Sequence, residues 1–284
     1  VMEKQFPRTQ VEGISLSRML IGTNWLLGWS HTSVSADEMI KARYDSAQAF
    51  RPVLEAYLRH GVDSIMAPFG LSPELTKAVK ETEQHMGREI VMIDTPTLNV
   101  DDTPEARREA ERMVKAAASR GAKLCLLHHS CVEQLVNKNL GQIPRLDDYT
   151  KMVRDAGMVP GLSAHMPELV VYSDKNGYDV QTYIQIFNCM GFLMQVEIET
   201  VASIIHNAKK PVMTIKSMAA GRCSPYVGLT FSWNAIREKD MVTVGAFSAN
   251  EAEEDIEISL AAIERRFPNL EKRASPVQNQ AAFG

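Results

Sequence analysis

Residues 161–188, GLSAHMPELVVYSDKNGYDVQTYIQIFN, contain one complete copy of the pattern that decides the fold. An apolar run ends at His165, a short helical segment follows, and Gly177 ends that segment before a second apolar run at 182–188. A strand, a helix and a strand joined in this way favour parallel pairing through a right-handed crossover. The stretch therefore predicts one βαβ unit with an ionisable ring at the end of its first strand.

The same alternation of a short apolar run and a longer amphipathic run occurs eight times along the chain. Eight such units in about 250 residues predict a closed (β/α)8 barrel, the TIM barrel, as a single α/β domain over residues 1–284. The barrel should span about residues 14–265, with a C-terminal extension at about 266–284. The expected strands are RMLIG at 18–22, DSIMAPF at 63–69, EIVMID at 89–94, AKLCLLHH at 122–129, MVPGLSAH at 158–165, TYIQIFN at 182–188, PVMTIKSM at 211–218 and MVTVGAF at 241–247.

Composition limits the classes of partner that this barrel could have. The 284 residues carry a net charge of −4, so no basic face for nucleic acid and no polybasic membrane anchor is expected. This composition is compatible with a small neutral or anionic ligand and with a homo-oligomer. Four scattered cysteines argue against a disulfide framework or a structural zinc site, which favours a reducing, cytoplasmic location. Because the sequence begins at Val1, a removed export signal is an alternative.

The residues that close the strands are the candidates for chemistry, because barrel active sites lie at the carboxyl ends of the strands. Side-chain alternation along each strand places Asp94, His128, His165 and Lys216 at the barrel mouth. The alternative is that polar residues at these ends are ordinary loop residues. The complete set of strand-closing candidates is Asn24, Phe69, Asp94, His128 or His129, His165, Asn188, Lys216 and Ser248.

Three of these candidates could hold a metal ion. His128, Asp94 and His165 follow consecutive strands, so they could share a divalent ion or act as catalytic acids and bases. Imidazole and carboxylate ligands suit zinc, iron, nickel or manganese. The alternative is a histidine that only caps the shell by hydrogen bonding, since no spacing such as HExxH is present.

Two further groups of residues are candidates for binding. Asn24, Asn188 and His31 could contact substrate, and His31, on the long first loop, could close over the mouth or simply be solvated. Ser248 and Asn250 start a helix whose free N–H groups favour an anion, although helix capping alone explains both residues. With Lys216 and Arg222 nearby, these residues predict a site for an anionic substrate or cofactor group, as in the phosphate sites of barrels.

Several of these stretches resemble the aldo-keto reductases. GVDSIMAPFGLSPE is similar to the second strand and turn of that family, AKLCLLHHS to its fourth strand, and GLSAHMPEL to its fifth. FN at 187–188 resembles the pair that closes the sixth strand. KPVMTIKSMAAGR and VTVGAFSANEAEEDI resemble the seventh and eighth strand regions, where the family binds the phosphates of its cofactor. The resemblance covers about residues 14–263 and implies an NADP(H)-dependent reductase barrel.

The catalytic tetrad of that family is largely absent from this chain. Its aspartate position falls on Met66, its tyrosine acid on Phe69 and its lysine near Asp94, and only His128 matches. A phenylalanine cannot donate a proton, and Ser163 is followed by alanine where the family has asparagine. NADP(H) is therefore not expected as the cofactor.

Three functions follow from these observations. The preferred one is a non-redox enzyme, a lyase, isomerase or hydrolase, that acts on a small carboxylated or phosphorylated carbonyl compound or sugar. The alternative is an NADP(H)-dependent reductase with a relocated proton donor. The third is a barrel that binds a ligand without catalysis. Fold alone does not choose among them.

Overall fold

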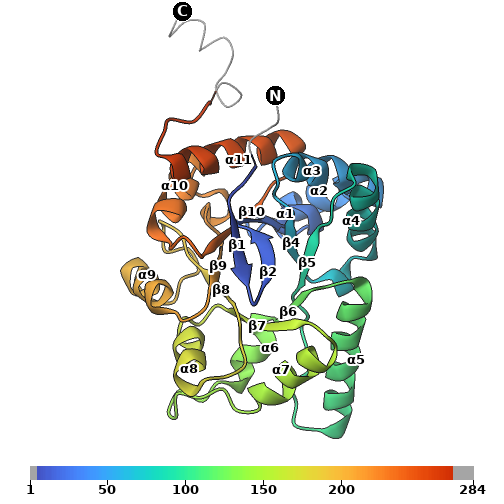
Figure 1. The fold of residues 1–284 in the computed structure, drawn as a ribbon, viewed down its shortest axis with the longest axis vertical. Helices are drawn as coiled ribbons and strands as arrows, with labels where there is room; N and C mark the ends of the chain where they lie inside the picture. Colours follow the sequence, from blue (N-terminus) through green and yellow to red (C-terminus); the bar gives the residue numbers. More distant parts are fainter. Residues whose placement is uncertain (1–4, 271–284) are drawn as a thin grey trace, which may run out of the picture.

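The computed structural model describes residues 5–270 and shows eight parallel strands closed into a barrel (Figure 1). Each barrel strand pairs with the next one along the chain, and the last pairs with the first. The predicted (β/α)8 fold is confirmed, and each barrel strand lies inside a predicted apolar run. The strands are β3 (Met19–Gly22), β4 (Ser64–Ala67), β5 (Val91–Asp94), β6 (Leu124–Leu127), β7 (Val159–Ala164), β8 (Tyr183–Ile186), β9 (Val212–Ile215) and β10 (Met241–Gly245).

A long helix follows each strand and surrounds the barrel (Figure 1). In strand order these helices are α3 (Ala47–Arg59), α4 (Pro73–Met86), α5 (Pro104–Arg120), α7 (Leu146–Asp155), α8 (Glu168–Asn176), α9 (Ile198–Asn207), α10 (Pro225–Ala235) and α11 (Ala249–Glu264). Shorter helices lie in the loops: α1 (Asn24–Leu27), α2 (Val34–Arg43), α6 (His129–Val132) and the 3₁₀ turns Phe69–Leu71, Glu133–Leu135 and Ala219–Gly221.

The residues at the helix ends explain why the sequence predicts where these helices begin and end. The Ser72 hydroxyl accepts a hydrogen bond from the Leu75 N–H at the start of α4, and Gly87 ends that helix with a left-handed φ of 63°. In α5 the Thr103 hydroxyl accepts a hydrogen bond at the start of the helix, and Gly121 ends it in the left-handed conformation. A side-chain acceptor satisfies a free N–H at the first turn, and glycine takes the left-handed conformation without a Cβ clash.

Strand residues alternate between the barrel interior and the helix layer. Leu124 and Leu126 of β6 belong to the interior cluster, whereas Cys125 and Leu127 pack against the surrounding helices. Both faces of every barrel strand are therefore buried, and apolar side chains fill the interior below the mouth.

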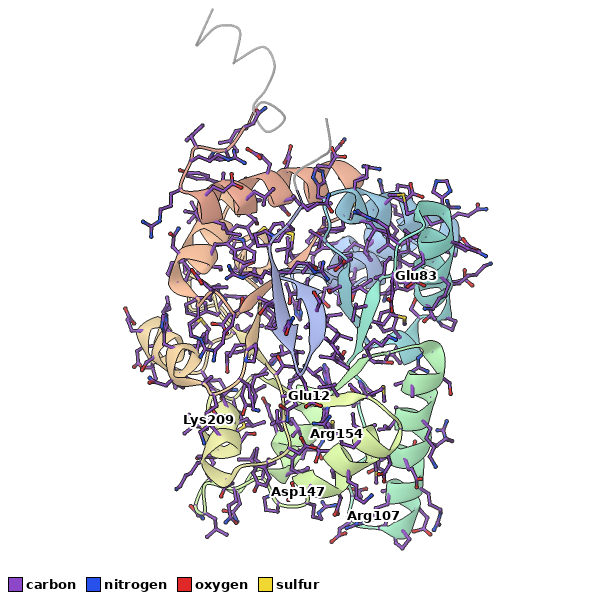
Figure 2. All side chains as sticks on the ribbon, in the orientation of Figure 1. Glu12, Glu83, Arg107, Asp147, Arg154 and Lys209 are labelled. Atoms are coloured by element: carbon purple, nitrogen blue, oxygen red, sulfur yellow. The ribbon has the colours of Figure 1, made fainter. Side chains whose placement is uncertain are left out.

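An antiparallel hairpin of β1 (Arg8–Val11) and β2 (Ile14–Ser17) lies across the barrel in Figure 1. Val11 and Leu16 of this hairpin pack with the interior cluster, so the hairpin covers the amino-terminal end of the barrel. Arg154 of α7 binds the hairpin residue Glu12 through two N–H groups, at 2.5 and 2.6 Å (Figure 2). The sequence did not predict this hairpin, and residues 14–17, which were assigned to the barrel, belong to it instead.

The chain after the barrel is described only to residue 270. Helix α11 ends at Glu264, close to the predicted barrel boundary, and Arg266 then pairs with Glu257 and Glu264. Most of the predicted C-terminal extension lies outside the described residues. Within residues 5–270, no helix has the length and apolar character needed to span a membrane.

Candidate functional site

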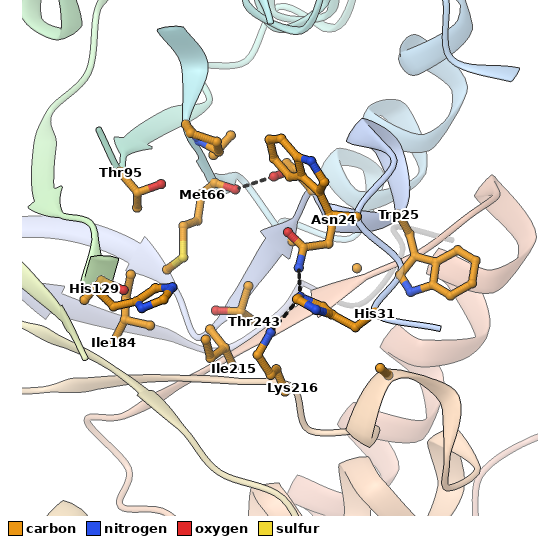
Figure 3. A pocket seen from close by; sticks show the side chains of 18 of the residues that line it. Asn24, Trp25, His31, Met66, Thr95, His129, Ile184, Ile215, Lys216 and Thr243 are labelled. Carbon is orange, nitrogen blue, oxygen red and sulfur yellow. Dashed lines mark hydrogen bonds between the residues drawn. The ribbon is translucent and has the colours of Figure 1, made fainter. Parts of the chain in front are cut away.

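A cavity of about 450 Å³ opens at the carboxyl ends of the strands, where the fold predicts a site (Figure 3). Its walls come from the loops after β3, β4, β5, β6, β7 and β9, together with residues of β10. Trp25, Trp29, Met66, Ile184 and Ile215 make a large part of the wall apolar. This volume suits a small molecule, since ligand pockets commonly span about 300–1,000 Å³.

Lys216 and His31 form the polar centre of the cavity. The Lys216 Nζ atom lies 2.9 Å from His31 Nε2, and Asn24 Nδ2 lies 3.3 Å from the same ring nitrogen (Figure 3). Burial lowers the pKa of Lys216 to about 8. Burial and the Lys216 ammonium lower the pKa of His31 as well, so the imidazole is neutral near pH 7 and can accept a hydrogen bond from the amine. The sequence named all three residues as site candidates.

Both Lys216 and His31 reach the cavity from strained backbone. Lys216 has a φ of 62° directly after β9, and His31 has a φ of 57° in the loop between α1 and α2. Residues other than glycine rarely adopt this left-handed conformation. This conformation ends β9 at Lys216 and interrupts the alternation of side chains along the strand. Lys216 and its neighbour Ile215 therefore both line the cavity.

Three histidines form a second polar group in the wall. His165 stacks on His129 with ring centroids 3.4 Å apart, and His129 lies 4.3 Å from His128. All three line the cavity, which confirms the predicted inward orientation of His165. Burial and the neighbouring His129 lower the pKa of His128 to about 4 and that of His165 to about 3. Both rings are therefore neutral at pH 7 and can accept hydrogen bonds.

Glu133 positions this histidine group and was missed by sequence reasoning. Its Oε1 atom accepts hydrogen bonds from the backbone N–H groups of His165 at 2.6 Å and Met166 at 2.8 Å. Its Oε2 atom lies 3.8 Å from His129 Nδ1. Burial opposes ionisation of Glu133, but these donors more than compensate and lower its pKa. Glu133 lies in the 3₁₀ turn after α6 and does not close a strand, so the sequence gave no signal for this role.

Two hydroxyl groups in the wall were also missed. Ser217 Oγ and Thr243 Oγ1 are buried and have no hydrogen-bond partner within the described chain, although both residues line the cavity. Buried polar atoms are normally paired, so these two unpaired hydroxyls are exceptions in the cavity wall. Neither Asp nor Glu occurs among the described residues that line the cavity.

Asp94 does not belong to this site, which corrects its prediction as a catalytic residue and metal ligand. The Asp94 side chain is 1% exposed and pairs with Arg120 of α5 at 2.9 Å, in the layer between strands and helices. It also accepts a hydrogen bond from the Phe69 N–H. Burial raises the pKa of Asp94, and Arg120 opposes that shift. In β5 the Ile93 side chain faces the barrel interior and the Asp94 side chain does not. The sequence-based assignment of interior and exterior positions in this strand was therefore wrong by one residue.

The predicted metal site is consequently not assembled. His128 and His165 line the cavity, but Asp94 faces the helices. Across residues 5–270, no group of three His, Cys, Asp or Glu side chains is arranged to hold a metal ion. These residues do not fit the divalent ion expected from their strand positions.

Asn188 is likewise structural, contrary to its prediction as a substrate contact. It is fully buried, and its Oδ1 atom accepts hydrogen bonds from the N–H groups of Met190 and Phe192. Its Nδ2 group donates to the Phe192 carbonyl oxygen. Asn188 therefore holds the loop after β8 in shape and does not line the cavity.

The predicted anion site at the start of α11 is occupied by the chain itself. Ser248 Oγ accepts a hydrogen bond from the Glu251 N–H, and the Glu251 carboxylate accepts one from the Phe247 N–H. This is a capping arrangement, which leaves a negative charge where an anion would bind. Asn250 is exposed and does not line the cavity. Of the four predicted residues, only Lys216 reaches the cavity.

Arg222 lies just outside the wall and supports it. Its guanidinium group lies 4.0 Å from the centroid of the Phe192 ring and donates hydrogen bonds to the His31 carbonyl oxygen at 3.4 and 3.5 Å. Arg222 therefore connects the loop after β9 with the loop that carries His31.

Comparison with known proteins supports the fold. No family model matches the sequence, and no curated protein matches it. A Pseudomonas aeruginosa protein assigned to the aldo-keto reductases has a similar structure, with a TM-score of 0.66, 13% identity and coverage of 93% of this chain and 100% of that one.

Two further solved structures have similar folds. A thermostable aldo-keto reductase in complex with epalrestat has a TM-score of 0.60 and 12% identity over 94% of this chain and 97% of that one. An aldo-keto reductase of Klebsiella pneumoniae in complex with NADPH has a TM-score of 0.57 and 14% identity over 99% and 95%. The chain is thus a (β/α)8 barrel whose fold resembles that of the aldo-keto reductases, as the sequence predicted.

Proposed function

We propose that this barrel is a non-redox enzyme of the lyase or isomerase class that acts on a small carboxylated or phosphorylated carbonyl compound. The observation that carries the proposal is the half-buried Lys216 amine, which faces an open cavity and contacts the neutral His31 ring. Perturbed lysines and histidines in one cleft are typical of catalytic sites.

The charge of the wall supports an anionic substrate. Lys216 is the formal cation of the cavity, and none of the lining residues that the structure describes is an acid. An anionic group would therefore gain attraction to the lysine without repulsion from a nearby carboxylate. The free hydroxyls of Ser217 and Thr243 would then donate hydrogen bonds to it.

The wall is less suited to the reductase alternative. Phe69, which replaces the family's tyrosine acid, is fully buried and does not line the cavity. Glu251 caps the helix at which the family would bind cofactor phosphate. The similarity in fold favours the reductase alternative. A similar fold, however, does not supply the missing proton donor.

Conversion of small carbonyl compounds tests this proposal. Pyruvate, dihydroxyacetone phosphate and ribose 5-phosphate, with the uncharged dihydroxyacetone and ribose as controls, are followed by proton NMR without nucleotide. We expect conversion of at least one anionic compound and no oxidation of NADPH in parallel assays. Reduction of a carbonyl compound that requires NADPH and disappears in His128→Ala would contradict the proposal and support the reductase. No conversion of any compound would contradict it as well.

The two hydroxyls provide a graded test of binding. Ser217→Ala and Thr243→Val should each raise KM by about 10- to 100-fold, because a hydrogen bond to a charged group contributes roughly 1.5–3 kcal/mol. Stability should be nearly unchanged, since neither hydroxyl has a partner in the described chain. Ser232→Ala is the matched control, a buried serine that also lacks a partner there but does not line the cavity. Equal KM values for all three variants would contradict the assignment.

A further inference from the structure

The Lys216 amine differs from the other lysines in its surroundings. Lys80 and Lys151 pair with carboxylates on the surface, at 3.0 and 2.7 Å. Among residues 5–270, no carboxylate forms an ion pair with the Lys216 amine, whose one polar contact there is the His31 ring at 2.9 Å. A buried ammonium without a counter-ion is destabilised relative to the uncharged amine.

This environment makes the amine available as a nucleophile. With a pKa of about 8, roughly a tenth of Lys216 is uncharged at pH 7, whereas an exposed lysine is almost fully protonated. Only the uncharged amine carries the lone pair that can attack a carbonyl carbon, and desolvated lysines are used in this way. The amine also faces open space, because the lysine lines the cavity and does not fill it.

We propose that Lys216 forms a covalent imine with the carbonyl group of the substrate, and that His31 moves the proton that this step requires. The inference rests on the proposed function, because it assumes a carbonyl compound in the cavity. It names the reacting atom of the protein, Lys216 Nζ, and restricts the substrate to an aldehyde, a ketone or a 2-oxo acid.

The atoms of this step balance without an oxidant or reductant. The nitrogen lone pair bonds to the carbonyl carbon while the π pair of the carbonyl moves to oxygen. His31 accepts a proton from the nitrogen and passes it to that oxygen, which gives a neutral carbinolamine. The hydroxyl then takes one proton from solvent and leaves as water while the nitrogen lone pair forms the C=N bond. One amine, one carbonyl and one proton give one protonated imine and one water.

His31 is placed for this proton transfer. Its Nε2 atom is within hydrogen-bond distance of the amine, and the ring is neutral near pH 7 because its pKa is lowered. Asn24 contacts the same nitrogen, and Arg222 holds the His31 carbonyl oxygen, so the ring is fixed from two sides. A base fixed within hydrogen-bond reach of the proton it accepts is the geometric requirement for general base catalysis.

The protonated imine explains why a lyase or an isomerase would use this site. A positively charged C=N group draws electrons from the neighbouring bond, which allows cleavage of a C–C bond or loss of a proton beside it. The neutral rings of His128 and His165 line the same cavity and can accept hydrogen bonds from the bound substrate.

Reductive trapping of the full chain tests the proposal. The protein is incubated at pH 7.5 with pyruvate, dihydroxyacetone phosphate or glycolaldehyde, with and without sodium borohydride, and analysed by intact mass and peptide mapping. We expect one stable adduct per chain, located at Lys216. It should form at least about 10-fold faster than adducts at surface lysines, because the free-base fraction of an amine rises 10-fold for each unit by which its pKa is lowered.

Two variants separate a nucleophile from a simple cation. Lys216→Arg keeps the charge but should lose the adduct completely, whereas His31→Gln should keep the site of the adduct and slow its formation by about 10- to 100-fold. An unaltered trapping rate in His31→Gln would overturn the role of His31. Adducts spread evenly over surface lysines would overturn the role of Lys216.

The outcome also separates this inference from the proposed function. If a compound is converted and Lys216→Arg retains that conversion, without any adduct in the wild type, the lysine acts only as a cation and the inference fails. If Lys216 is trapped selectively by a compound that is not converted, the inference stands and the proposed function fails.

Discussion

Lys216→Met should abolish conversion of the carbonyl substrate while leaving the fold intact or more stable. Loss of the covalent nucleophile should lower kcat by at least about 10³-fold, as for other residues that form covalent intermediates. Methionine has a similar length without the charge, so it removes the cost of burying an ammonium that lacks a counter-ion. We expect the free energy of unfolding in urea at pH 7 to rise by about 1–2 kcal/mol.

The stability difference should depend on pH in a defined direction. The folded pKa of Lys216 is about 8, below the value of 10.5 for a free lysine. Between these values the unfolded chain binds more protons than the folded one, so wild-type stability rises with pH in this window. The advantage of Lys216→Met should therefore shrink between pH 8 and pH 10. A variant that is less stable than the wild type at pH 7, with unaltered conversion, would contradict this account.

Arg120→Met should cause a larger loss of stability than any of the substitutions in the cavity wall. It leaves the Asp94 carboxylate buried without its partner, which costs about 3–5 kcal/mol in comparable cases. Because burial raises the pKa of Asp94, its protonation relieves part of this cost. The deficit, measured by urea unfolding, should thus be smaller at pH 5 than at pH 7.5.

The double variant Arg120→Met with Asp94→Asn provides the matched control. It removes the charge together with its partner, so most of the lost stability should return. Asp94→Asn alone should leave trapping at Lys216 unchanged, because Asp94 faces the helix layer. Loss of trapping in Asp94→Asn, with its stability unaltered, would restore Asp94 as a site residue.

The barrel could be predicted from the sequence because the patterns that indicate its strands and helix ends are local. Apolar runs predicted the strands, and residues such as Ser72 and Gly87 predicted the ends of helices through hydrogen bonds within one turn. The hairpin at residues 8–17 was missed, because its short strands are stabilised by contacts with the barrel interior and not by a pattern of their own.

The site was predicted only in part, because the orientation of a strand buried on both faces is ambiguous. In β7 the small residues Gly161 and Ser163 indicated the interior face, and His165 followed correctly. In β5 both faces are apolar, so the alternation could not show that Ile93 and not Asp94 points inward. Glu133 could not be found at all, since its role depends on hydrogen bonds to residues over 30 positions away in the chain.

Competitive acetylation of lysines as a function of pH, read by peptide mass spectrometry, tests the central claim most directly. The Lys216 charge acts on His31, His128 and His165, and within residues 5–270 no carboxylate pairs with the amine. The account predicts that acetylation of Lys216 follows a titration with a midpoint near pH 8, below the ordinary value of about 10.4 for a lysine side chain. A midpoint for Lys216 at pH 10 or above would contradict the account, because the amine would then be fully protonated at neutral pH.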